Sequence, residues 1–170
     1  HRWEHDKDPD TFFRVMLALA EQDTPFKLAV CGENYSKSPS IFARARAILE
    51  ERIVSWGYLD SRQDYEALLA RADIAVSTAA HEFFGISMLE AVHYGSRPLV
   101  PDRLSYRELF PDKYRYQSEA DLLSQLTELC RTDWGVNRRQ ARETFRGLAE
   151  PFGALQLARY ADLIRASVLG

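Results

Sequence analysis

Short apolar segments alternate with longer segments of helical periodicity along most of this chain. The apolar segments have the length of buried strands, and they cover residues 26–31, 53–56, 74–77 and 98–100. Between them stand segments whose apolar residues lie three and four positions apart, as in amphipathic helices. Because this alternation is typical of βαβ units, we predict an α/β fold with a parallel sheet that helices cover on both faces.

Capping residues mark where several of the helices begin. We expect Asp8 to cap a helix that has Pro9 in its first position, and Ser61 and Ser118 to cap two others. The pattern predicts further helices over residues 40–51, 106–110, 136–147 and 152–167. The last two are expected to be separate because Pro151 and the glycine that follows it interrupt the helical pattern.

The segment after the third apolar run carries two carboxylates, Glu82 and Glu90, with seven residues between them. After Gly85 the spacing becomes helical, and Gly95 has the position of a helix C-cap. The start of a helix presents backbone N–H groups and a positive dipole end, which favour phosphate. Glu90 would lie roughly 7 Å along this helix, at about 1.5 Å per residue, so the two carboxylates would flank a bound diphosphate. Glu90 also follows apolar residues and therefore needs a polar partner if it is buried.

The residues that follow the predicted strands are expected to meet at one crevice, because ligands of parallel sheets bind at the carboxyl ends of the strands. Those ends are Gly32, Gly57-Tyr58, residues 77–82 and Pro101-Asp102. The pair Ser77-Thr78 fits equally well a plain loop and a wall of this crevice.

The polar segment from His1 to Lys7 has the character of a loop that follows a strand, yet the sequence has no strand before it. In this topology the missing strand would be a central one. We therefore expect the 170 residues to be one domain excised from a longer protein, with another part of that protein absent.

Composition narrows the range of functions. With 46% hydrophobic residues the chain can bury a core, and its net charge of −3 argues against a surface built entirely for nucleic acid. No apolar run has the length of a membrane span, so no membrane partner is expected. Cys31 and Cys130 form no metal or redox motif and fit a reducing, cytoplasmic setting.

The glutamate segment resembles a motif of the retaining glycosyltransferases of GT-B type, family 4. In that family a Glu, a Gly, a Phe and a Gly are followed by apolar residues, then Leu-Glu-Ala and a further glycine. The corresponding residues here are Glu82-Phe83-Phe84-Gly85, Leu89-Glu90-Ala91 and Gly95. Arg2, Lys7, Gly32 and Gly57-Tyr58-Leu59 also stand in the family's order. The resemblance covers about residues 1–165 and implies the C-terminal, Rossmann-like half of a GT-B fold, so that residues 1–170 would be a donor-binding domain.

The resemblance also implies roles for individual residues. Arg2 and Lys7 would hold the diphosphate of a nucleotide sugar, and Glu82 would contact the transferred sugar as a nucleophile or, preferably, as a positioning group. Glu90 would accept hydrogen bonds from the ribose. The remaining donor-binding residues would be backbone groups for the phosphates and the base: Gly32, Gly57, Tyr58, Leu59, Phe84, Gly85 and Ile86. No metal or other cofactor is expected, because Arg, Lys and a helix end supply the positive charge that a leaving diphosphate needs.

Several segments are more similar to one branch of the family, which transfers mannose from GDP-mannose to queuosine in tRNA. They are residues 1–9, 56–59 and 81–85. The resemblance thus implies GDP-mannose as donor and a tRNA acceptor that is bound mainly by the absent N-terminal half. Phe83 replaces the first glycine of the family motif, which puts the shape of this loop and the choice of sugar in question.

Other interpretations remain open at the level of sequence. Asp6-Lys7-Asp8 contains the Asp-x-Asp pattern of metal-dependent glycosyltransferases of another fold, and residues 1–5 match an inverted zinc-protease motif. Arg139, Arg142 and Arg146 share one helix face and fit either tRNA phosphates or a solvated surface. A non-catalytic nucleotide-binding or interaction module of the same fold is a further alternative, as is another donor or acceptor.

Overall fold

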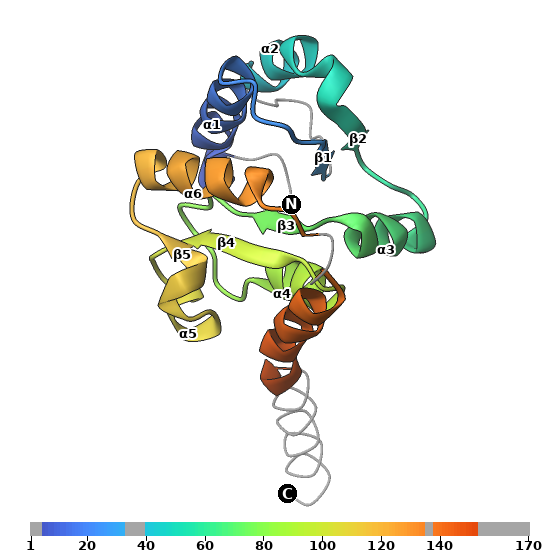
Figure 1. The fold of residues 1–170 in the computed structure, drawn as a ribbon, viewed down its shortest axis with the longest axis vertical. Helices are drawn as coiled ribbons and strands as arrows, with labels where there is room; N and C mark the ends of the chain where they lie inside the picture. Colours follow the sequence, from blue (N-terminus) through green and yellow to red (C-terminus); the bar gives the residue numbers. More distant parts are fainter. Residues whose placement is uncertain (1–4, 33–39, 135–137, 153–170) are drawn as a thin grey trace, which may run out of the picture.

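The computed structural model describes residues 5–32, 40–134 and 138–152, and it has an α/β architecture with parallel strands. Strand β1 (Leu28–Cys31) pairs with β2 (Ile53–Gly57). Strand β4 (Arg97–Pro101) pairs with β3 (Ile74–Val76) on one side and with β5 (Arg115–Tyr116) on the other. The described strands therefore form two parallel sheets, where the sequence predicted one (Figure 1).

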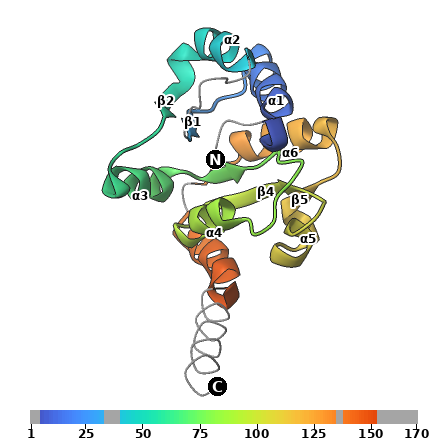
Figure 2. The ribbon, with the colours of Figure 1, turned by 180° about the vertical axis from the view of Figure 1, so that it is seen from behind.

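Helices cover both faces of the β3–β4–β5 sheet. Helix α4 (Ile86–His93) packs on one face, and α6 (Glu119–Arg131) lies on the opposite face, beside α1 (Pro9–Glu21) (Figures 1 and 2). The other helices are α2 (Ile41–Ile48), α3 (Arg62–Arg71), α5 (Tyr106–Leu109), a helix over residues 138–152, and the 3₁₀ turns η1 (His5–Lys7), η2 (Glu50–Arg52) and η3 (Asp112–Tyr114). None of the described helices is long and apolar enough to cross a membrane.

The predicted caps are confirmed. The Asp8 carboxylate accepts a hydrogen bond from the Thr11 N–H at 3.2 Å, and the hydroxyls of Ser61 and Ser118 accept equivalent bonds three residues further on, also at 3.2 Å. The predicted break at Pro151 is wrong, because one helix runs from residue 138 to residue 152. The ring of Pro151 removes a single backbone donor there, and Phe152 is still part of the described helix. The helix predicted over residues 152–167 lies almost entirely outside the described residues.

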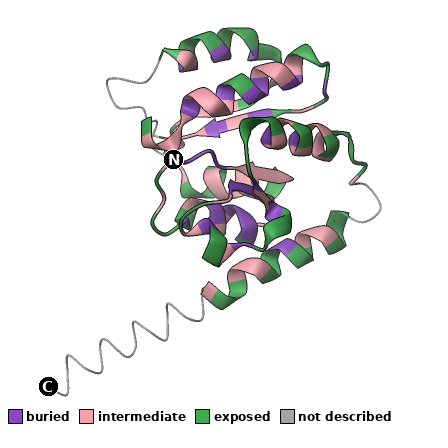
Figure 3. Cartoon of the chain, turned by 90° about the vertical axis from the view of Figure 1, so that its left-hand side faces the viewer, coloured by how far each residue is buried: buried purple, intermediate pink, exposed green. Residues whose placement is uncertain are grey.

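Strand β4 separates two apolar cores. Its neighbouring residues Leu99 and Val100 are both 0% exposed, and they point to opposite faces of the sheet. Leu99 packs with residues such as Phe13 and Leu122 beneath α1 and α6, whereas Val100 packs with the residues around Tyr106. Figure 3 shows that the buried positions of the helices face the sheets and the exposed positions face outward.

An apolar cavity of about 570 Å³ is lined by both β1 and β3. Within the described residues β1 pairs only with β2 and β3 only with β4, so the two strands leave facing edges without a ladder partner. Residues of α1, α4 and α6 complete the lining, among them Phe13, Met88 and Leu126. The cavity thus lies between the β1–β2 sheet and the β3–β4–β5 sheet.

Candidate functional site

The loop after β3 carries Glu82 and is tied to the η1 turn. The carbonyl of Asp6 accepts hydrogen bonds from the N–H groups of Ala80 and His81, at 2.8 and 3.2 Å. The Lys7 ammonium donates to the carbonyl of His81 at 3.0 Å and lies 3.4 Å from a carboxylate oxygen of Glu82. Two residues that are 75 positions apart in the sequence thus form an ion pair at the carboxyl end of β3.

The carboxylate of Glu82 closes the turn that begins α4. Its Oε1 accepts hydrogen bonds from the N–H groups of Gly85 and Phe84, at 3.0 and 3.3 Å. Burial raises the pKa of Glu82, but these hydrogen bonds and the charge of Lys7 outweigh that effect and bring the pKa below its usual value. Two N–H groups that were expected to assist a phosphate therefore bind a carboxylate in this structure.

Gly85 allows the chain to turn from this loop into α4. Its φ of 62° is left-handed, and a Cβ atom there would lie 2.6 Å from Cδ1 of Leu109. The side chains on either side are open to solvent: Phe84 is 69% exposed and Ile86 is 57% exposed. Phe83, which departs from the family motif, is 83% exposed, so its ring is not buried.

Glu90 has two polar partners, as its apolar surroundings predicted. The Tyr65 hydroxyl donates to Oε2 at 3.2 Å, and the Arg62 guanidinium donates to Oε1 at 3.1 Å. Both partners come from α3, and the Glu90 side chain remains 30% exposed. This pairing could not be predicted from the sequence, because neither Arg62 nor Tyr65 stands out within its own helix.

The residues expected to contact the base lie at the carboxyl ends of β1 and β2. The N–H of Gly32 donates to the carbonyl of Gly57 at 3.2 Å, and Gly57 has a left-handed φ of 105°. Tyr58 is 65% exposed and Leu59 is partly buried, in the loop that leads into α3. Of the remaining predicted site residues, Lys7 and Glu82 are in direct contact, whereas Arg2 lies outside the described residues.

Side-chain hydroxyl groups hold the glutamate loop in place, and the sequence analysis assigned no role to one of them, Ser105. Ser77 accepts a hydrogen bond from the Tyr106 hydroxyl at 2.8 Å, and Thr78 donates to the carbonyl of Lys7 at 2.9 Å. Ser105 donates to the carbonyl of Glu82 at 3.0 Å. Ser77 and Thr78 are 2% and 5% exposed, so their side chains support the loop from within the protein.

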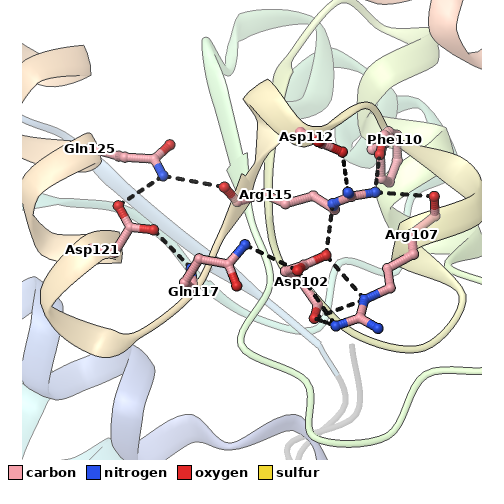
Figure 4. A network of polar contacts seen from close by, with 8 residues as sticks. All are labelled: Asp102, Arg107, Phe110, Asp112, Arg115, Gln117, Asp121 and Gln125. Carbon is pink, nitrogen blue, oxygen red and sulfur yellow. Dashed lines mark hydrogen bonds and ion pairs between the residues drawn. The ribbon is translucent and has the colours of Figure 1, made fainter.

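Asp102, at the carboxyl end of β4, fixes the loop that carries Ser105 (Figure 4). It accepts hydrogen bonds from Gln117 at 3.0 Å and Arg107 at 3.1 Å, and it lies 2.9 Å from Nε of Arg115. The hydrogen bond from Gln117, followed by that from Arg107, lowers the pKa of Asp102. Asp102 was expected at the edge of the crevice, and its carboxylate is engaged in this network.

The arginines of the last described helix do not form one solvated face. Arg142 is turned inward, where it donates to the carbonyls of Ala72 at 3.1 Å and Tyr94 at 2.8 Å. Arg139 is 94% exposed and pairs with Glu143. Because Arg142 is turned inward, the three arginines do not form the single face that was considered for binding tRNA phosphates.

No group of three or more His, Cys, Asp or Glu side chains that could hold a metal occurs within the described part of the chain. Asp8 serves as the cap of α1, and Asp6 pairs with Lys7 at 3.1 Å. The zinc motif cannot be placed, since His1 lies outside the described residues.

The fold and the motif together define a class. In solved structures, the arrangement resembles pneumococcal O-GlcNAc transferase GtfA in complex with UDP and GlcNAc, with a TM-score of 0.74 and 17% identity over 98% of this chain and 34% of that one. The structural neighbours are GT-B glycosyltransferases, and the chain has the α/β fold of one part of such a protein.

Sequence comparison adds the family. Residues 1–121 match the model of glycosyl transferases group 1, and the chain belongs to that family. It is 35% identical to tRNA-queuosine alpha-mannosyltransferase of Drosophila melanogaster, over 99% of this chain and 45% of the relative. It is also 27% identical, over 59% of its length, to GDP-mannose:cellobiosyl-diphosphopolyprenol alpha-mannosyltransferase of Xanthomonas oryzae, of which it covers 27%. The chain thus spans less than half the length of these curated relatives.

Proposed function

We propose that this chain is the donor-binding domain of a retaining glycosyltransferase that transfers a hexose from a nucleotide sugar. The observation that carries the proposal is the contact between Lys7 and Glu82 at the start of α4. It places a cation, a carboxylate and a helix N-terminus at the carboxyl end of a parallel sheet, where ligands of such sheets bind.

In this proposal each group has a task that its chemistry suits. The Lys7 ammonium and Arg2 stabilise the negative charge of the departing diphosphate. Glu82, which is ionised at neutral pH, orients hydroxyl groups of the transferred sugar. Binding of the diphosphate would draw the N–H groups near Phe84, Gly85 and Ile86 toward the phosphates.

The nucleoside would extend from this centre toward β1 and β2. Glu90 would accept hydrogen bonds from the ribose hydroxyls, and the backbone at Gly32 and from Gly57 to Leu59 would contact the base. These groups are charged or polar and need no metal ion, so donor binding is expected to be independent of added metal.

We further propose GDP-mannose as the donor and queuosine in tRNA as the acceptor, in the cytoplasm. The names of both curated relatives support mannose, and the relative from Drosophila supports tRNA. The acceptor would be bound mainly by an N-terminal domain that these 170 residues do not include, and no membrane partner is expected.

A calorimetric titration with GDP, UDP, GDP-mannose and UDP-glucose, with and without Mg²⁺, tests the proposal. We expect the guanine compounds to bind and the uridine compounds not to bind, with no effect of the metal. Preferential binding of UDP compounds would contradict the choice of donor. A folded protein that binds none of the four would favour the non-catalytic alternative.

Substitution of the carried-over residues tests their roles. Glu90→Ala and Lys7→Ala are each expected to weaken GDP-mannose binding by about tenfold or more, the value of one hydrogen bond to a charged group. Glu143→Ala is a matched control, because Glu143 is 59% exposed and lies on the helix over residues 138–152. Unchanged affinity in both site variants would refute the assigned roles.

A further inference from the structure

The two carboxylate oxygens of Glu90 are held in different ways by one helix. Oε2 accepts from the hydroxyl of Tyr65, a half-buried side chain, at 3.2 Å. Oε1 accepts from the guanidinium of Arg62, a side chain that is 62% exposed, at 3.1 Å. One oxygen is therefore bound from the protein side and the other from the solvent side.

Arg62 has a second carboxylate at hand. Its Nε lies 2.6 Å from Oε1 of Glu66, one turn along α3, and its guanidinium carbon lies 5.6 Å from the centre of the Tyr65 ring. Because an exposed ion pair contributes little free energy, the bond to Glu90 can be exchanged at low cost while Arg62 stays paired with Glu66.

Tyr65 differs from Arg62, because its side chain is half-buried and its hydroxyl fixes Oε2 of Glu90. Burial, followed by the negative charge of Glu90, raises the pKa of Tyr65 to about 12, so its hydroxyl remains a hydrogen-bond donor at neutral pH. A phenol on a helix has few rotatable bonds, and it fixes Oε2 at a small cost in side-chain entropy. The orientation of the Glu90 carboxylate is thus set from α3.

We propose that Tyr65 is a positioning residue for the ribose, and that the donor displaces Arg62 from Oε1 of Glu90 while Tyr65 keeps Oε2. This inference rests on the proposed function, because it concerns the same Glu90 carboxylate that the proposed function assigns to the ribose. Only hydrogen bonds are exchanged: the ribose hydroxyls donate to Oε1, and the Arg62 guanidinium turns to Glu66 and water.

The test compares two ligands in the full-length protein: GDP and 2′,3′-dideoxy-GDP, which lacks the ribose hydroxyls. Tyr65→Phe removes only the hydroxyl and is expected to weaken GDP binding by about tenfold while changing dideoxy-GDP binding less than about twofold. An equal loss for both ligands, or no loss for GDP, would overturn the positioning role. Thermal melting of the variant confirms that it is folded.

Arg62→Ala tests the displacement. Since the wild-type protein must break the Arg62–Glu90 pair before the ribose binds, the variant is expected to bind GDP about two- to fivefold more tightly at low salt. Unchanged or weaker GDP binding would overturn the displacement. Weaker binding would mean that the Arg62 guanidinium contacts the donor.

Glu66→Gln is the matched control, since it alters the other partner of Arg62 and leaves Glu90 with both of its hydrogen bonds. It is expected to keep the wild-type preference for GDP over dideoxy-GDP.

Glu90→Gln distinguishes failure of the proposed ribose site from failure of the role of Tyr65. If it leaves GDP binding unchanged, the ribose site itself is wrong. If it weakens GDP binding and Tyr65→Phe does not, only the role of Tyr65 is wrong.

Discussion

At the scale of single residues, Glu82 has most of its hydrogen-bonding capacity taken up by the protein. Gly85 and Phe84 supply N–H donors to one carboxylate oxygen, and Lys7 approaches the other. A carboxylate held in this way is ready to orient hydroxyl groups but is poorly free to attack a carbon atom. In the function that we propose, Glu82 is therefore a positioning group rather than a nucleophile.

Glu82→Gln distinguishes these two roles by the size of its effect. A positioning residue that loses its charge is expected to lower kcat/KM by about 10- to 100-fold, which corresponds to one or two hydrogen bonds to a charged group. Loss of a nucleophile would be far more severe, on the order of 10⁴-fold or beyond. Steady-state kinetics of the full-length protein provide the measurement, and a drop of the larger size would contradict positioning.

The lowered pKa values of Glu82, Glu119 and Asp102 predict how stability depends on pH. A carboxyl group with a lower pKa in the folded state contributes stability that is fully present above its unfolded value, which is 4.5 for Glu and 3.8 for Asp. That contribution is lost as the pH falls through the folded-state pKa. We expect the Tm to be steady from pH 7 to 5 and to fall below about pH 4.5. A Tm that does not change down to pH 3 would contradict this.

At the scale of elements, the sequence predicted features that depend on near neighbours. The caps at Asp8, Ser61 and Ser118 were predictable because each involves an N–H only three residues away. The contacts of Glu90 with Tyr65 and Arg62 were not, since they depend on how α3 packs against α4. The hydrogen bond from Ser105 to the carbonyl of Glu82 was not predictable for the same reason.

Gly85→Ala tests the turn that joins the glutamate loop to α4. An alanine at a φ of 62° costs roughly 1–2 kcal/mol, and its Cβ would in addition displace the Leu109 side chain. We expect urea denaturation to show a loss of at least this size. Gly147→Ala is the matched control, because no atom lies within 4 Å of an added Cβ in that helix. It is expected to stabilise the protein by about 0.5–1 kcal/mol. Equal effects of the two changes would contradict the role of Gly85.

At the scale of the whole molecule, the sequence predicted the order of strands and helices but could not predict two sheets in place of one. Short apolar segments show that strands are buried, yet they carry no information on which edges meet. In the structure, residues of β1 and β3 line a cavity of about 570 Å³ that lies between the two sheets. Its presence leaves backbone groups of both strands facing each other across apolar space.

Those unpaired edges predict a pattern of amide hydrogen exchange. On β1 and β3 the N–H groups that face the cavity should exchange markedly faster than those that face β2 and β4, although the strands are similarly covered. NMR or mass spectrometry of exchanged fragments measures the difference. Uniform protection along both strands would show that the edges are paired, either within one molecule or between two copies.

The cavity also bears on cooperativity. The β1–β2 sheet and the β3–β4–β5 sheet communicate only through the packing of side chains, since no backbone ladder joins them among the described strands. Leu99 and Tyr116 share one apolar core with Leu28 and Val30 of β1, and this core links the two sheets. We expect calorimetry to show two overlapping melting events, with a van't Hoff enthalpy below the calorimetric enthalpy. Such a result would mean that the two sheets unfold as coupled units joined by their shared core.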